Sequence, residues 1–149
     1  MSNDEKNNLK LTGKNEEDLK VISAYLQDSV VIVKDIVFLK KNRTFIMILN
    51  RFMWEDLEKG VFNKNRRIRS AIKFEEVLEV NSKSINQKNK NKALEYLAIK
   101  CSLVPNNFFK IKIFFSGDSI ITLISEVIEV TMNDLGKPWK VKYFPTHKI

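Results

Sequence analysis

The chain has 149 residues, a formal net charge of +8 and one cysteine. Its hydrophobic content of 44% predicts a globular protein, and its length suits one domain with a substantial core. The single histidine, His147, stands at the C-terminal end, which leaves Ser-His-Asp catalysis and multi-histidine metal sites without their residues. No glycine-rich phosphate-binding motif occurs. We therefore expect no cofactor, no metal site and no enzymatic activity.

The hydropathy pattern favours the cytoplasm over a membrane. Residues 1–18 are polar, so we expect no signal peptide. Uninterrupted apolar runs reach about five residues, as in Phe45–Leu49, whereas a membrane-spanning helix needs about 20. The lone Cys101 cannot form an internal disulfide, which fits a reducing compartment. Because Cys101 alternates with Ile99 and Leu103, we expect it to be a small apolar residue in a strand.

The N-terminal part predicts a tail followed by a helix. Residues 1–14 have no apolar pattern and are expected to be a mobile tail, which leaves a single domain over 15–149. Asn15 has the character of a helix N-cap, and three acidic residues follow it. The spacing of Leu19, Ile22 and Leu26 predicts an amphipathic helix over 16–28 that packs on a sheet.

Beyond residue 29 the pattern is typical of strands. Apolar alternation and β-branched residues predict strands at 30–33, 36–39, 44–52, 70–80, 97–103, 109–115 and 120–124. Glu76 is an exception within the segment 70–80. The all-apolar centre at 45–49 predicts a central strand covered on both faces. Residues 126–135 fit either a helix or a strand, and their β-branched content favours the strand.

The segment Ser116-Gly117-Asp118-Ser119 predicts a two-residue hairpin turn. In that register Phe115 pairs with Ile120, so Ile121 and Leu123 lie on the face opposite to the apolar residues at 109, 111, 113 and 115.

These elements predict an α+β fold, with an N-terminal helix followed by six to eight mostly antiparallel strands. We expect a small barrel or a strongly bent sheet, similar in shape to a pleckstrin-homology domain.

Three residues are candidates for binding a protein. Arg51 and Trp54 follow the buried strand, and Trp139 lies near the C-terminus. Arginine and tryptophan are enriched in the hot spots of interfaces. The alternative is that Trp54 caps the core and that Arg51 pairs with Glu55 or Asp56.

A second set of residues is a candidate for binding nucleic acid. Two basic loops, 59–73 and 83–92, would form a phosphate-binding patch if they were adjacent. The candidate contacts are Lys64, Arg66, Arg67, Arg69 and Lys83. A solvated loop, or arginines paired with acids elsewhere, is the alternative, and the excess of lysine also fits A/T-rich codons.

Three islands of sequence resemble a known family. They are Asp18-Leu19 with 21–24 and 26–28; 49–52 with Trp54-Glu55, Arg66-Arg67 and Arg69; and 134–136 with Pro138-Trp139. Together they are similar to a family of short alphaproteobacterial proteins that carry a domain of unknown function, over about residues 9–147. The resemblance implies a bacterial, cytoplasmic, single-domain protein and assigns no activity or catalytic residue.

The leading hypothesis is therefore a non-enzymatic interaction module with a protein partner, which uses Arg51, Trp54 and Trp139 as anchors. The alternative is a weak RNA- or DNA-binding domain that uses the basic loops.

Overall fold

The computed structural model describes residues 8–58, 65–142 and 145. Its helices and strands, in chain order, are β1 (Lys10–Gly13), α2 (Glu16–Tyr25), β2 (Val30–Leu39), η1 (Lys40–Asn42), β3 (Thr44–Phe52), α3 (Glu55–Glu58), β4 (Arg66–Phe74), β5 (Val77–Lys83), β6 (Ala93–Val104), η2 (Pro105–Asn107), β7 (Phe108–Phe115), β8 (Ile120–Ser125) and β9 (Val130–Lys140).

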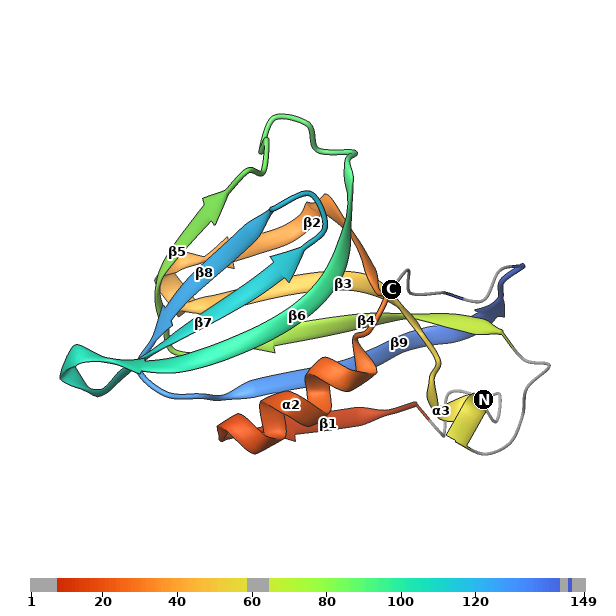
Figure 1. Ribbon diagram of the computed structural model, residues 1–149, viewed down its shortest axis with the longest axis horizontal. Coiled ribbons are helices and arrows are strands. Elements are labelled where there is room, and N and C mark those ends of the chain that lie inside the picture. The colour runs from red at the N-terminus through yellow and green to blue at the C-terminus, as the bar shows by residue number, and fades with distance from the viewer. Residues whose placement is uncertain (1–7, 59–64, 143–144, 146–149) are drawn as a thin grey trace.

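Among the described residues, nine strands pair into one open antiparallel sheet. The order is β1-β9-β4-β3-β2-β6-β7-β8-β5, so β1 and β5 form the two edges. Figure 1 shows β6, β7, β8 and β5 lying in front of β2, β3, β4 and β9. The prediction of an N-terminal helix followed by six to eight strands in a small barrel or pleckstrin-homology-like shape is therefore wrong.

Two features of the chain explain the extra strands. β1 precedes the helix and carries one aliphatic residue, Leu11, whose strand conformation comes from pairing with Met132 of β9. Residues 10–13 therefore belong to the sheet and not to a tail, while residues 1–7 lie outside the described part. The predicted strand 70–80 is divided because Glu76 has φ 55°, a left-handed conformation that no glycine signals there.

Other local predictions agree with the structure. Of the segment 126–135, residues 130–135 are strand and not helix, as the β-branched content favoured, whereas residues 126–129 precede the strand. β3 lies between β2 and β4 and is central, as predicted. Its residues at 45, 47 and 49 are buried, whereas Ile46 and Ile48 on the opposite face are only part-buried, so β3 is not fully covered on both faces.

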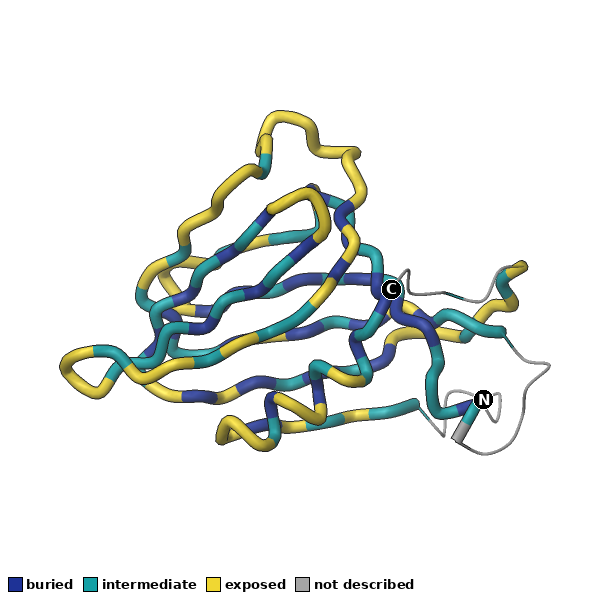
Figure 2. Tube along the Cα trace, viewed as in Figure 1, coloured by how far each residue is buried: buried dark blue, intermediate teal, exposed yellow. Residues whose placement is uncertain are grey.

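The core lies between the two halves of the sheet and beneath α2 (Figure 2). Leu19, Ile22 and Leu26 are buried in it, as the helical spacing predicted. The helix begins where predicted, because the Asn15 side chain accepts a 2.8 Å hydrogen bond from the backbone N–H of Asp18. It ends earlier than predicted, at Tyr25.

The β7–β8 hairpin has a different register from the predicted one. Ile113 pairs with Ile121, and the N–H of Phe115 donates to the carbonyl of Ser119 at 2.9 Å, so the loop holds three residues. Gly117 and Asp118 both have positive φ, at 73° and 60°. The one-residue shift turns Ile121 and Leu123 into the core, beside Ile111 and Ile113, instead of away from it.

Candidate functional site

Arg51 lies at the end of β3 in a buried charge cluster. Its guanidinium donates to both oxygens of Asp134 in β9, with distances of 2.8 Å from Nε and 2.7 Å from Nη2. It also donates to both oxygens of Glu55 in α3, at 2.9 Å from Nη1 and 2.6 Å from Nη2. Ser70 of β4 donates to Asp134 at 2.5 Å. The cluster therefore ties β3, β4, β9 and α3 together.

The position of Arg51 decides what it can contact. Its side chain is fully buried, so it offers no surface to a partner in this structure. Burial alone would lower the pKa of Arg51, but the hydrogen bonds and negative charges of Asp134 and Glu55 raise it above its ordinary value. The structure thus contains the predicted pair with Glu55 and adds Asp134, a partner 83 positions away in sequence.

Trp54, Arg67 and Trp139 come together at one end of the sheet. Phe52, Arg67 and Trp139 stand opposite one another on β3, β4 and β9. The ring of Trp54 lies edge-on to Phe52 at 4.7 Å between centroids, and its Nε1 donates to the carbonyl of Gln27 at 2.8 Å. Trp54 is part-buried, whereas Trp139 is 39% exposed.

The basic run is mostly a strand and not a loop. β4 begins at Arg66, so the predicted loop 59–73 is wrong from that residue onward, and Lys64 lies outside the described residues. Arg66 makes two bonds to Asp56, at 3.0 and 2.8 Å. Arg67 donates to the carbonyls of Asp28 and Asn50 at 3.0 Å each, and burial lowers its pKa.

The described parts of the two basic segments, 65–73 and 83–92, do not form one patch. Arg69 lies on β4, whereas Lys83 ends β5 and leads into the loop 84–92. Figure 1 shows this loop at the top of the molecule, away from β4 and β9.

We define the outer face as the side of β2, β3, β4 and β9 that points away from the core. Pairing places Val37 beside Ile46, Ile48 beside Ala71, and Arg69 between Asn50 and Leu135. Residues directly opposite on neighbouring strands share a face, so these side chains form one surface. Its apolar members are Val37, Ile46, Ile48, Ala71, Leu135 and Trp139, and its cations are Arg67, Arg69 and Lys73.

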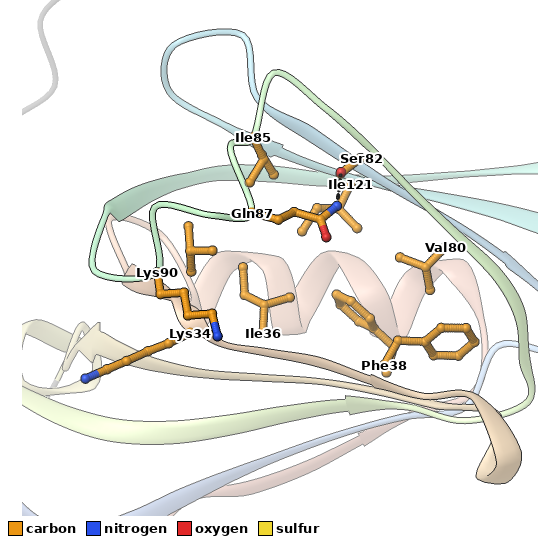
Figure 3. A pocket seen from close by; sticks show the side chains of 11 residues that line it. Lys34, Ile36, Phe38, Val80, Ser82, Ile85, Gln87, Lys90 and Ile121 are labelled. Carbon is orange, nitrogen blue, oxygen red and sulfur yellow. Dashed lines mark hydrogen bonds between the residues drawn. The ribbon is translucent and has the colours of Figure 1, made fainter.

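A cavity of about 430 Å³ opens at the other side of the sheet, between β2 and β5 (Figure 3). The loop 84–92 contributes Ile85, Gln87 and Lys90 to its lining. The sequence placed these residues in the basic loop 83–92, a candidate contact for nucleic acid, and did not indicate a cavity. Their signal was weak, because one isoleucine in a polar loop does not indicate that the loop folds back on the core.

Three further observations concern the Cys101 thiol, metal binding and membrane-spanning helices. Burial, and secondly the charge of Glu16, raises the pKa of Cys101 to about 11, so its thiol is protonated at neutral pH. Among residues 8–58, 65–142 and 145, no group of three or more His, Cys, Asp or Glu side chains is placed to hold a metal ion. Within the same residues, no helix has the length and hydrophobicity needed to span a bilayer.

Comparison with known proteins identifies the family. The family model described as "Protein of unknown function (DUF2948)" matches residues 9–147. The chain belongs to this family. No curated protein and no solved structure matches the chain. The predicted resemblance to a family with a domain of unknown function is thereby confirmed, and the residues that carried it include Arg51 and Asp134 of the buried cluster.

Proposed function

We propose that this DUF2948 protein is a non-enzymatic interaction module that binds an acidic protein on its outer face. The observation that carries the proposal is the composition of that face. A water-facing side of an antiparallel sheet is normally polar. On this face, however, Val37 is 42% exposed and Trp139 is 39% exposed, and the part-buried Ile46 and Ile48 lie on β3.

The charge of the same face favours an acidic partner. The side chains of Arg69 and Lys73 are about half exposed, and Asp35, with 19% of its side chain exposed, pairs with Arg69 at 3.6 Å. These cations lie in a row on β4, between the apolar residues of β3 and those of β9, so they match a partner surface in which a line of carboxylates runs between apolar side chains. Trp139 would be the anchor at one end of this surface, because tryptophan and arginine contribute most often to interface hot spots. Arg51 has no part in this surface.

The proposal places the module in the bacterial cytoplasm. The single cysteine supports a reducing compartment, and the resemblance to alphaproteobacterial proteins supports the origin.

The test compares surface variants of the full-length chain. Tagged wild type, Trp139→Ala and Arg69→Glu are used to capture proteins from nuclease-treated bacterial extract, and a protein lost by both variants is purified for a binding titration. We expect Trp139→Ala to weaken its affinity by about thirtyfold, the size of a hot-spot loss of about 2 kcal/mol. Leu103→Ala is the matched control, because Leu103 is 61% exposed on β6, outside the outer face.

Two results would contradict the proposal. One is a partner whose affinity falls equally for the Leu103 control and the outer-face variants. The other is a ligand that proves to be RNA or DNA, whose affinity must fall steeply as salt rises because each phosphate contact releases counterions.

A further inference from the structure

The cavity between β2 and β5 lies where the sheet stays open. β6 pairs with β2 over Val30–Ile32, and the loop 84–92 then hydrogen-bonds to Val33 and Lys34, at 3.0 Å to the Lys92 carbonyl and 2.9 Å to the Lys90 carbonyl. Beyond that point β2 and β5 are not neighbours in the sheet. The space between them is therefore a mouth that leads from solvent to the core.

The walls of this mouth are apolar. Ile36 and Phe38 pair with Met47 and Phe45, whose side chains are in the core, so they face inward. Val80 and Ile85 close the opposite side, and the buried residues Phe45 and Ile121 form part of the lining. The lining also contains a polar pair, in which Nε2 of Gln87 donates to Oγ of Ser82 at 3.2 Å.

Positive charge stands at one end of the cavity. Figure 3 shows Lys34 and Lys90 at that end, with the ammonium group of Lys34 pointing away from that of Lys90, while Phe38 and Val80 lie at the other end and Ile36 between them. Among the residues that the structure describes, no carboxylate lines the cavity. Within the described part of the chain, neither lysine is in an ion pair. The backbone bond from the Lys34 N–H to the Lys90 carbonyl holds the two residues close together, and long lysine side chains can reach over an apolar mouth.

We propose that this cavity binds a free single-chain fatty carboxylate, with the acyl chain against Ile36, Phe38 and Val80 and the carboxylate between Lys34 and Lys90. The volume of about 430 Å³ lies within the range of roughly 300–1,000 Å³ that small-molecule sites occupy. An unbranched chain suits the apolar wall of Ile36, Phe38 and Val80, and an anion suits an end with two cations and no acid. This site is separate from the outer face and does not depend on the proposed partner.

The experiment compares an anion with its uncharged analogue. Dodecanoate and dodecanol, each below its aggregation concentration, are titrated into the full chain by calorimetry and by NMR shifts. We expect saturable 1:1 binding of dodecanoate with shifts at Ile36, Phe38 and Val80. Lys34→Gln/Lys90→Gln should weaken dodecanoate by about tenfold, the effect of two partly exposed ion pairs, and change dodecanol by less than about twofold. Lys88→Gln, in the same loop but outside the lining, is the control.

A second variant tests the cavity itself. Val80→Trp fills the apolar end, so both ligands should be lost while the thermal unfolding midpoint is retained. The proposal is overturned if dodecanoate fails to saturate, if it binds Val80→Trp unchanged, or if the double lysine variant and Lys88→Gln bind it equally well.

Discussion

At the residue scale, the buried side chain of Arg51 forms salt bridges with two carboxylates. A buried guanidinium is costly to desolvate, and its bidentate bonds to Asp134 and Glu55 offset that cost because the planar donors match both carboxylates. Removing the cation would leave Asp134, which is 8% exposed, without its charge partner.

We therefore expect Arg51→Ala to lower the free energy of unfolding by about 3–5 kcal/mol, measured by urea denaturation. Arg51→Lys should recover only part of this loss, because one ammonium cannot form four directed bonds. Arg43→Ala is the control: its pair with Glu126 at 3.0 Å is about half exposed and should contribute less than about 1 kcal/mol. Equal losses for Arg51→Ala and Arg43→Ala would contradict a structural role for the cluster.

Cys101 gives a prediction about pH. Since burial raises the pKa of its thiol from 9.0 to about 11, the reactive thiolate stays scarce at pH 8. Alkylation by iodoacetamide, followed by mass spectrometry, should run roughly ten- to a hundredfold slower at pH 8 in the folded chain than in urea. The folded rate should rise about tenfold per pH unit from pH 8 to 10, because each unit below the pKa changes the thiolate fraction by that factor. A rate that levels off near pH 9 would show that the thiol is not perturbed.

At the element scale, the β7–β8 hairpin shows how a single loop residue fixes two faces of a sheet. The segment 116–119 has the composition of a tight turn, and the sequence located that turn correctly. It did not distinguish a two-residue loop from a three-residue loop, because Asp118 adopts a positive φ that either loop accommodates. Only packing decides between them, since the observed register buries Ile121 and Leu123 together with Ile113.

The register predicts unequal costs for neighbouring truncations. Leu123 is fully buried opposite Ile111, so Leu123→Ala should cost about 2–5 kcal/mol in urea denaturation. Ile124 faces the other side, opposite Lys110, and is part-buried, so Ile124→Ala should cost clearly less. The reverse order would indicate the two-residue turn.

At the scale of the whole molecule, local sequence patterns predicted most helices and strands. They did not predict the long-range pairing and packing that join these elements. The helix, central strand β3 and the strand at 130–135 follow from spacing and β-branched content. β1 does not, because its four residues become a strand only against β9, more than a hundred positions away. The site follows the same division. The sequence named Arg51, Trp54 and Trp139, but only the fold separates buried Arg51 from exposed Trp139 and brings Lys34 next to Lys90.

The same long-range pairing determines how the net charge of +8 should be interpreted. Arg66 bonds twice to Asp56, which is 4% exposed, and Arg67 bonds to two backbone carbonyls, so both arginines hold β4 against its neighbours. Arg66→Glu/Arg67→Glu would place an acid against Asp56 and remove the hydrogen bonds that Arg67 donates to the two carbonyls. We expect it to lower the free energy of unfolding by about 2–4 kcal/mol.

Lys83→Glu/Lys88→Glu makes the same change in net charge at exposed positions and should alter stability by less than about 1 kcal/mol. Urea denaturation of both variants separates a structural role of the arginines from an effect of total charge. If the two double variants unfold at the same urea concentration, the arginines do not stabilise the fold. If only the arginine variant is destabilised, a loss of nucleic-acid binding by it would not identify a phosphate contact. In that case Arg69→Glu is the variant that tests for a phosphate contact. Arg69 is a half-exposed cation of β4, and its salt bridge to Asp35 is long, at 3.6 Å.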